Sequence, residues 1–238
     1  MSKKSRRGRL RSQKSAPISP VILLKWIVGF LKRAMTFIKI CGITNLPDAL
    51  AAVEGGADAL GFNFYRPSSR YVEPVVARKI IEQIPKQVLT VGVFVNEEDP
   101  KSIADEAGVE AFQLHGDESP SYCKLLNDRY VIKTFAVDEN FDVNNVLEYD
   151  VDAVMLDARH HSLRGGTGQV IDWSVAKRVN ELGVRLFLAG GLSPENVQEA
   201  IASVGPYAVD ACSSIEAAPG KKDFVRLKDF LERARLGR

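Results

Sequence analysis

From Phe37 onward, short apolar runs alternate along the chain with longer stretches whose apolar residues recur at a spacing near 3.6. Short apolar runs are typical of buried strands, and the 3.6 spacing is typical of amphipathic helices. The pattern therefore predicts eight strands. They are Phe37–Ile40, Ala59–Phe64, Val88–Val95, Ala111–Leu114, Val131–Phe135, Ala153–Leu156, Arg185–Ala189 and Ala208–Val209.

Helix starts are marked by Asp99-Pro100, Ser119-Pro120 and Ser193-Pro194. Each pair places a capping side chain before a proline at the first helical position. The last predicted helix has an apolar face made by Leu227, Phe230 and Leu231.

Eight strands, each followed by a helix, predict an α/β fold with one closed (β/α)₈ TIM barrel. An open doubly wound sheet is the alternative. That sheet normally carries a glycine-rich dinucleotide fingerprint after its first strand, and Cys41-Gly42-Ile43-Thr44 is not one. We therefore favour the barrel.

Charge divides the chain into two parts. Residues 1–36 hold ten Lys and Arg and no acid, whereas residues 37–238 hold 22 basic and 30 acidic side chains, a net charge of −8. Residues 1–15 are too polar and charged to bury a core, which predicts disorder. We expect a basic N-terminal extension over residues 1–35 and a catalytic barrel over residues 36–238.

The extension contains an apolar run, Val21–Leu31, which is too short to span a membrane at about 20 residues per crossing. No small-residue cleavage site follows it, which disfavours a signal peptide. An organellar transit peptide stays open. We favour a misplaced start, with Met35 as the true first residue, or a dispensable tail over a functional arm.

Composition restricts the class of protein further. With 45% hydrophobic and 26% charged residues and no long biased tract, the chain is not collagenous, a coiled coil or wholly disordered. Three cysteines, an odd number, do not make a disulfide framework, so we expect a reducing compartment and a cytoplasmic location. Monomer and homodimer stay open, because core and exposed apolar helix faces look alike in sequence.

Active sites of such barrels lie at the carboxyl ends of the strands. In the first strand, the period of two puts Lys39 and Cys41 on one face and Ile38 and Ile40 on the other. The isoleucines suit the helix side, so Lys39 and Cys41 are expected to point into the barrel mouth. An ammonium nearby favours a thiolate, which can act as a base. A small core residue is the other interpretation of Cys41.

Other strand ends also carry polar groups. Arg66 and Arg70 follow the second strand and suggest an anionic substrate, because guanidinium grips carboxylate or phosphate; for Arg66 we prefer a solvated loop residue. Gln113 and His115 close the fourth strand, and a titrating and a structural role for His115 stay open. Asp157 follows the sixth strand, where partial desolvation would suit a general acid.

A glycine-rich loop, Gly165–Gly168, follows the sixth strand and could close over a ligand. His160 and His161 look like a metal pair, but adjacent residues seldom converge on one ion, and we expect no metal. At the last two strand ends, Gly190 and Gly191 let the backbone approach an anion. Together with Ser213 and Ser214 they predict a phosphate site.

These groups predict an enzyme that moves protons on a small, phosphorylated, carboxylate-bearing molecule. No nucleotide-binding motif or metal constellation is visible, so we expect no cofactor. For the barrel we expect no nucleic-acid partner and no membrane span.

The order of several motifs resembles the phosphoribosylanthranilate isomerase family of tryptophan biosynthesis from about Thr36 to the last helix. The motifs are Lys39-Ile-Cys41-Gly42, Gly56-Ala-Asp58-Ala-Leu-Gly61-Phe62, Ser69-Arg70-Tyr71, Val91-Gly92-Val93-Phe94-Val95-Asn96, Gln113-Leu-His115-Gly116, and Leu156-Asp157 before Gly165-Gly166-Thr167-Gly168.

The resemblance implies a TIM barrel and an Amadori rearrangement of N-(5-phosphoribosyl)anthranilate to the 1-deoxyribulose 5-phosphate. It implies Cys41 as the general base, Asp157 as the general acid and Arg70 at the anthranilate carboxylate. Related barrel isomerases of histidine biosynthesis use a carboxylate where Cys41 stands, so the thiol favours the tryptophan reaction. The substrate-binding residues expected from the rim and the resemblance are Lys39, Arg70, Gln113, His115, Gly166, Gly191, Ser213 and Ser214.

Three features depart from the family pattern. The usual Ser-Ser-Gly-Val-Glu reads Cys212-Ser213-Ser214-Ile215-Glu216 here. Loss of the glycine at Ser214 would disfavour a left-handed backbone, so we expect weakened or re-angled phosphate binding. The loop 159–164 is unusually basic, and residues 1–34 have no counterpart.

A different class of function is an inactive barrel that binds nucleic acid or a membrane surface through its basic arm, with steep salt dependence. A chain that begins at Met35 distinguishes the two. This shortened chain keeps isomerase activity if the barrel is the functional part. It loses its function if the basic arm is the part that binds.

Overall fold

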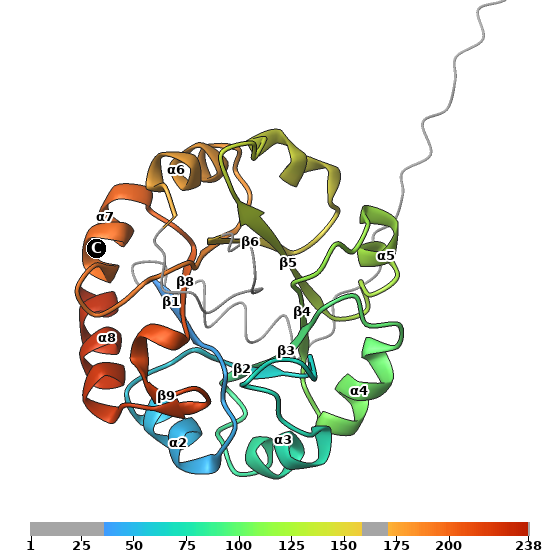
Figure 1. Cartoon of the computed structure of the whole chain (residues 1–238), viewed down its shortest axis with the longest axis vertical. Helices are drawn as coiled ribbons and strands as arrows, with labels where there is room; N and C mark the ends of the chain where they lie inside the picture. Colours follow the sequence, from blue (N-terminus) through green and yellow to red (C-terminus); the bar gives the residue numbers. More distant parts are fainter. Residues whose placement is uncertain (1–35, 159–170, 238) are drawn as a thin grey trace, which may run out of the picture. The chain divides into compact units, whose positions relative to one another are not determined.

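The eight strands pair in chain order, all parallel, and the last pairs with the first, so that the sheet closes into a barrel (Figure 1). The computed structural model describes residues 36–158 and 171–237. This arrangement confirms the (β/α)₈ barrel and excludes the open sheet. The strands are β1 (Phe37–Ile40), β2 (Ala59–Asn63), β3 (Leu89–Phe94), β4 (Ala111–Leu114), β5 (Tyr130–Val137), β6 (Ala153–Ala158), β7 (Leu186–Leu188) and β8 (Ala208–Ala211).

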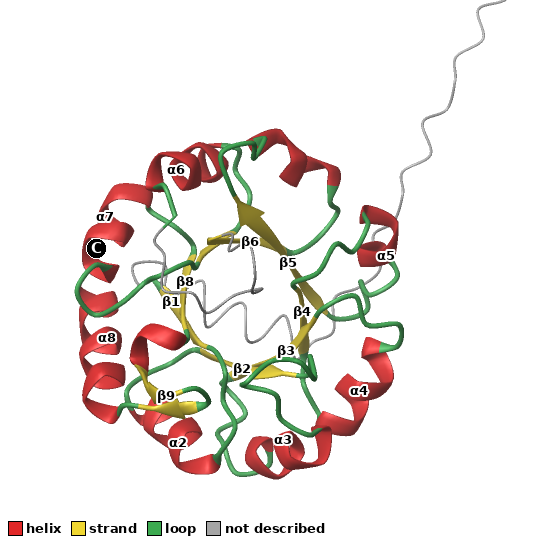
Figure 2. Cartoon of the chain, in the orientation of Figure 1, coloured by secondary structure: helices red, strands yellow, loops and turns green. Residues whose placement is uncertain are grey.

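Helices surround the barrel on its outer side (Figure 2). They are α2 (Leu46–Glu54), α3 (Pro74–Ile81), α4 (Pro100–Ala107), α5 (Pro120–Lys124), α6 (Trp173–Glu181), α7 (Val197–Val204) and α8 (Phe224–Leu236). Two 3₁₀ helices, η1 (Val143–Glu148) and η2 (Ser213–Ile215), and a hairpin of β9 (Glu216–Ala218) and β10 (Lys221–Lys222) complete the described elements.

Some strands extend beyond their apolar runs. The predicted sixth strand ends at Leu156, but β6 continues through Asp157 to Ala158 because β5 and β6 pair residue by residue up to Val137 and Ala158. The carboxyl end of β6 is set by its hydrogen bonds to β5. The spacing of apolar residues in the sequence carries no information about such bonds. As a result Asp157 is part of a strand rather than of the loop after it.

The element after β5 differs from the expectation of an α-helix after every strand, because it is the 3₁₀ helix η1. Its surroundings are rich in Asp and Asn, whose side chains bond to nearby backbone and compete with helix formation. The carboxylate of Asp142 accepts a hydrogen bond from the backbone N–H of Asn144 at 2.9 Å. Local bonding of this kind replaces a longer helix.

Two of the three predicted caps are confirmed. The side chain of Asp99 caps α4 and that of Ser119 caps α5, each with proline next. The third prediction, Ser193-Pro194, is wrong. There the chain forms a turn, and α7 begins three residues later, at Val197 after Asn196.

An Asn side chain explains the late start of α7. The side-chain oxygen of Asn196 accepts from the backbone N–H of Ser193 at 2.8 Å, and its amide donates to the carbonyl of Gly191 at 3.0 Å. These bonds tie Asn196 back to the loop and delay the helix.

The period-two assignment of β1 is confirmed. Ile38 and Ile40 are fully buried in the core between strands and helices. Lys39 and Cys41 face the barrel interior, where a Cβ on Gly61 of β2 would lie 3.1 Å from Lys39 Nζ and 2.8 Å from Cys41 Sγ. The predicted apolar face of α8 is buried as well, at Leu227, Phe230 and Leu231.

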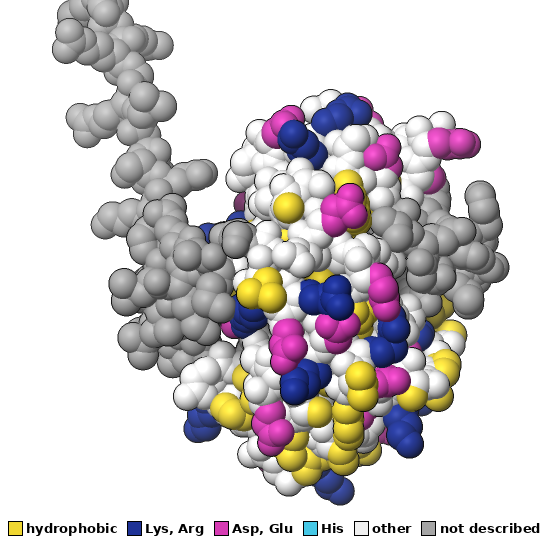
Figure 3. All heavy atoms as spheres, turned by 90° about the vertical axis from the view of Figure 1, so that its left-hand side faces the viewer, with side chains coloured by type: hydrophobic (Ala, Val, Ile, Leu, Met, Phe, Trp, Pro, Cys, Tyr) yellow, Lys and Arg dark blue, Asp and Glu magenta, His cyan; other side chains and the backbone are white. Residues whose placement is uncertain are grey.

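The side of the barrel that carries α7 and α8 shows basic and acidic side chains interspersed (Figure 3). None of the helices within residues 36–158 and 171–237 is long and apolar enough to cross a membrane.

A buried ion pair ties the loop after β4 to β5. Lys133 Nζ lies 2.8 Å from a carboxylate oxygen of Glu118, and the two side chains are 3% and 2% exposed. The ammonium also donates to the carbonyl of Gly116 at 2.8 Å. The other oxygen of Glu118 accepts from the backbone N–H of Asn96 at 2.8 Å, so the pair joins the loops after β3 and β4.

Substituting Lys133→Met should lower the free energy of unfolding by about 3–5 kcal/mol, because Glu118 is left charged and buried without its partner. Denaturant unfolding monitored by circular dichroism measures the change. The matched control is Lys101→Met, which breaks an exposed pair with Asp128 and should cost less than about 1 kcal/mol. Equal losses in the two variants would contradict the assignment.

Candidate active site

The predicted site residues that the structure describes lie at or next to the carboxyl ends of the strands. Parallel strands of a closed barrel present these ends on one side, which explains why residues far apart in sequence meet there. Cys41 follows β1, Arg70 lies in the loop after β2, and Asp157 is in β6. Gly166, His160 and His161 lie outside the described residues.

At the base of the site, Lys39 and Asp210 form a buried ion pair. Lys39 Nζ lies 2.7 Å from the Asp210 carboxylate, with side chains 0% and 9% exposed. Burial lowers the pKa of Lys39, but the charges of Asp210 and Cys41 outweigh it and raise the pKa above its ordinary value. Lys39 is therefore a fixed positive charge within the barrel.

Cys41 lies in surroundings that favour its thiolate. A hydrogen bond from Cys212 lowers the pKa of Cys41 most, burial raises it, and the charges of Lys39 and Lys222 lower it, leaving the pKa well below its ordinary value. The same contact and burial raise the pKa of Cys212. The positive charges of Lys39 and Lys222 favour the anion on Cys41, whereas the Sγ of Cys212 lies 3.8 Å from Glu216 Oε1, whose negative charge disfavours an anion on Cys212.

Asp157 and His115 meet across the interior. His115 Nε2 lies 3.4 Å from one carboxylate oxygen of Asp157. The other oxygen accepts from the backbone N–H of Ala158 at 2.9 Å. Gln113 lies beside them, with its amide nitrogen 3.5 Å from His115 Nδ1. Its buried amide oxygen has no hydrogen-bond partner within the described chain.

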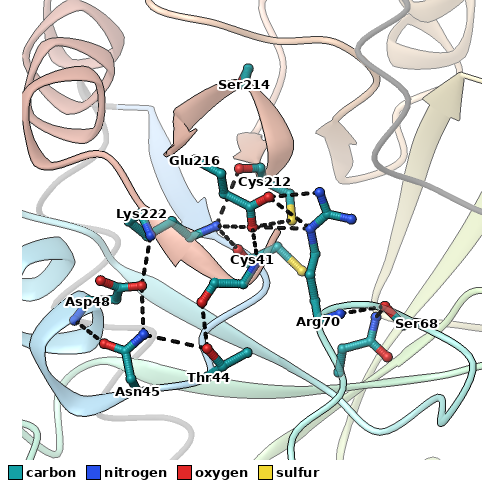
Figure 4. A network of polar contacts seen from close by, with 12 residues as sticks. Cys41, Thr44, Asn45, Asp48, Ser68, Arg70, Cys212, Ser214, Glu216 and Lys222 are labelled. Atoms are coloured by element: carbon teal, nitrogen blue, oxygen red, sulfur yellow. Dashed lines mark hydrogen bonds and ion pairs between the residues drawn. The ribbon is translucent and has the colours of Figure 1, made fainter. Parts of the chain in front are cut away.

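Arg70 is held along one edge of its guanidinium (Figure 4). Its Nε donates to the Glu216 carboxylate at 3.0 Å and its Nη2 at 2.7 Å. Over residues 36–158 and 171–237, no group accepts a hydrogen bond from Nη1 of Arg70. The guanidinium thus keeps a second edge on which a further carboxylate could bind.

The predicted phosphate region combines two glycines with positive φ and the short helix η2. Gly190 and Gly191 have φ of 75° and 71°, a conformation that suits glycine. Ser213 and Ser214 both lie in η2, after β8.

The structure corrects the expectation for Ser214. We expected weakened or re-angled phosphate binding because a serine disfavours the left-handed backbone that a glycine allows, but among the described non-glycine residues only Asn96 has a positive φ. Ser214 lies in right-handed 3₁₀ structure, and its hydroxyl donates to the carbonyl of Leu192. Backbone strain is therefore no reason to expect weaker phosphate binding here.

Three residues near Cys41 escaped the sequence analysis as site residues: Cys212, Glu216 and Lys222. Cys212 and Glu216 were noticed only as parts of a variant motif. Lys222 gave no signal, because its contact with Cys41 spans 181 residues of sequence. The fact that Lys222 is buried is visible only in the folded chain.

The described residues also line a partly open pocket of about 550 Å³ beside the rim, between the loops after β2 and β3 and the helices that follow. None of the predicted catalytic residues lines it. Among residues 36–158 and 171–237, no group of three or more His, Cys, Asp or Glu side chains is placed to hold a metal ion.

Such a rim, with groups of different acidity at the ends of parallel strands, defines the class of barrel enzymes that move protons within small anionic molecules. Residues 38–233 match the family model described as N-(5'-phosphoribosyl)anthranilate (PRA) isomerase. The chain belongs to this family and is an isomerase of tryptophan biosynthesis.

Individual relatives agree. The N-(5'-phosphoribosyl)anthranilate isomerase of Thermotoga neapolitana is 48% identical over 204 residues, covering 84% of this chain and 99% of that protein. The crystal structure of the Thermotoga maritima enzyme has a TM-score of 0.77 at 43% identity, covering 84% and 98% of the two chains. A further isomerase structure, also 43% identical over 84% and 98%, has a TM-score of 0.74 and contains reduced 1-(o-carboxyphenylamino)-1-deoxyribulose 5-phosphate.

The low pKa of Cys41 can be tested without substrate. Thiolates absorb in the ultraviolet where thiols do not, so wild type should show thiolate absorbance below the ordinary thiol pKa of about 8.5. Cys41→Ser should remove this absorbance at neutral pH. Cys123→Ser should retain it, because burial raises the pKa of Cys123 to about 11. Absorbance in wild type that appears only in alkaline solution would contradict the assignment.

Proposed function

We propose that the chain converts N-(5-phosphoribosyl)anthranilate to 1-(2-carboxyphenylamino)-1-deoxyribulose 5-phosphate, with Cys41 as the general base and Asp157 as the general acid. One observation carries this assignment: a thiol in surroundings that favour its anion and a carboxylate lie at the same end of the barrel. β1 and β6 are connected through β8 and β7. A small substrate in the mouth would therefore have a different group on each side.

The chemistry needs two groups of different acidity. Asp157 donates a proton to the furanose oxygen as the bond between that oxygen and C1′ breaks, and the anilino nitrogen forms an iminium with C1′. The iminium makes the C2′ proton acidic, and the Cys41 thiolate removes it to give an enolamine. Tautomerisation then yields the ketone. In this last step the C2′ hydroxyl loses a proton and C1′ gains one. Proton exchange with solvent then returns Asp157 to the acid and Cys41 to the thiolate, so that a full cycle neither consumes nor releases a proton.

Asp157 is suited to this role by its contacts. One carboxylate oxygen is fixed by the backbone N–H of Ala158, which leaves the oxygen nearer to His115 to carry the proton. His115 then orients the carboxylate. The unpartnered amide oxygen of Gln113 supports a role in binding, because a buried acceptor without a donor is costly unless a ligand supplies one.

The ends of the substrate would be held by different elements. The free edge of Arg70 suits the anthranilate carboxylate, because guanidinium and carboxylate form parallel hydrogen bonds. Gly191, Ser213 and Ser214 suit the phosphate, together with Gly166 of the loop outside the described residues. The relative crystallised with the reduced product analogue contains a ligand with both groups. Lys39 would act from below the site as a fixed charge rather than by direct contact, since its side chain is fully buried.

Removal of either proposed proton-transfer group should lower kcat by about 10²- to 10⁴-fold. Cys41→Ser and Asp157→Asn are the variants, and the decay of phosphoribosylanthranilate fluorescence with purified protein measures turnover. Cys123→Ser is the matched control, because Cys123 is buried in α5, on the outer side of the barrel, and this variant should turn over like wild type. Undiminished decay with Cys41→Ser or Asp157→Asn would reject the assigned mechanism, and no decay with wild type would reject the substrate.

A further inference from the structure

Two buried charged residues beside Cys41 take no part in the mechanism above. Glu216 and Lys222 belong to the hairpin β9–β10, which follows η2. Their side chains are 3% and 0% exposed, and Lys222 Nζ lies 3.1 Å from Glu216 Oε1. Burying two charges is costly, so their other contacts decide what they do.

Lys222 uses all three donors of its ammonium. Nζ donates to the carbonyl of Cys41 at 2.6 Å, to the carbonyl of Cys212 at 3.3 Å and to Glu216 Oε1 at 3.1 Å. Cys41 directly follows β1 and Cys212 directly follows β8. The ammonium therefore joins the ends of the first and last strands, at the point where the barrel closes.

Glu216 connects this point to Arg70. Both of its oxygens contact the guanidinium, and Oε1 also accepts from the backbone N–H of Gly220 at 3.3 Å. Burial raises the pKa of Glu216, but hydrogen bonds from Arg70 and the charge of Lys222 outweigh it, so the pKa lies below its ordinary value. Glu216 is therefore a carboxylate at neutral pH.

Figure 4 shows these side chains together: the carboxylate of Glu216 lies between the ammonium of Lys222 and the guanidinium of Arg70, with Cys41 next to them. With Cys41 as thiolate, two positive and two negative charges share this space and cancel. Loss of any one of them leaves a net charge in a buried place, which the remaining groups must accommodate by moving or by changing protonation.

We propose that Lys222 and Glu216 act as a clamp of positioning residues: Glu216 orients Arg70 so that its free edge faces the substrate carboxylate, and Lys222 holds Cys41 in place and in its charged form. The clamp rests on the proposed function, since it acts through the residues assigned there to the base and to the carboxylate. It touches neither reacting atoms nor substrate.

The Glu216 arm of the clamp is tested by Glu216→Gln, which keeps the shape of the side chain and removes its charge. KM for phosphoribosylanthranilate should rise about three- to tenfold. Without the Glu216 carboxylate the Arg70 side chain can move, and fixing it on substrate binding costs affinity. The value of kcat should change less than KM. Glu216→Asp, which keeps the charge but cannot reach as far, should give an intermediate KM and serves if the Gln variant does not fold.

The matched control for this arm is Asp58→Asn. Asp58 pairs with Arg235 at 2.8 Å, with side chains 15% and 19% exposed, and it precedes β2 at the opposite end of the barrel. This variant should lose thermal stability without a change in KM. A KM in Glu216→Gln that moves no more than in Asp58→Asn would overturn the clamp.

A double-variant cycle separates the clamp from the proposed function. Arg70→Gln alone should raise KM, and Glu216→Gln should add nothing in that background, because the residue it orients is gone. If Arg70→Gln leaves KM unchanged, the assignment of Arg70 fails. If Arg70→Gln raises KM but the Glu216 effect is additive or absent, the clamp alone fails.

The Lys222 arm is tested by the pH dependence of kcat/KM. Lys222→Met should move the acidic limb to higher pH by about one unit or more, because a positive charge that lowers the pKa of Cys41 is removed. Lys222→Gln provides a second variant if Lys222→Met does not fold. The substitution leaves in place the other residues whose charges or hydrogen bonds act on Cys41. They are Lys39, Arg70, Asp210, Cys212 and, through Cys212, Glu216.

Lys133→Met is the matched control for this arm, because Lys133 is a buried lysine that also binds backbone carbonyls and a glutamate. It should lose stability while the acidic limb stays in place. An unmoved limb in Lys222→Met, or an equal shift in Lys133→Met, would overturn the assignment of Lys222.

Discussion

The pairing of β1 with β8 is the interaction on which the site depends. It aligns Lys39 with Asp210 and continues one residue beyond β1, where the backbone N–H of Cys41 donates to the carbonyl of Ala211 at 2.9 Å. Closure turns residues near the two ends of the barrel sequence into neighbours. Without it, Cys41 would have neither Cys212 nor Lys222 beside it, and its thiol would titrate like any other.

Closure also explains why so many charges are buried at this end. Lys39 with Asp210 and Lys222 with Glu216 lie almost out of contact with solvent. Buried pairs of this kind contribute little net stability compared with well-packed apolar side chains. Their effect is to fix charge and direction at this end of the barrel, and the proposed transfer of a proton from carbon to Cys41 would depend on such fixed charge.

One prediction from a local motif was wrong, and the reason behind another does not hold, because contacts outside the motif set the backbone. Ser193-Pro194 has the form of a helix start, yet the side chain of Asn196 bonds back to the loop and delays α7. Ser214 replaces a glycine of the family pattern, but η2 is right-handed at this position and a serine fits without strain. In both places the local motif is compatible with more than one backbone path, and contacts outside the motif select among them.

The sequence alone predicted the class of fold and the approximate strands. It also predicted which residues of β1 face outward and which face inward. Periodicity carries this information because each residue's burial depends on its position along a local helix or strand. The kinds of chemistry at the rim were visible too, since strand ends can be read from the chain. Partners were not: Lys39 and Asp210 are 171 residues apart, and Arg70 and Glu216 are 146 apart. Which charges meet is decided by closure and register, and both exist only once the strands have paired.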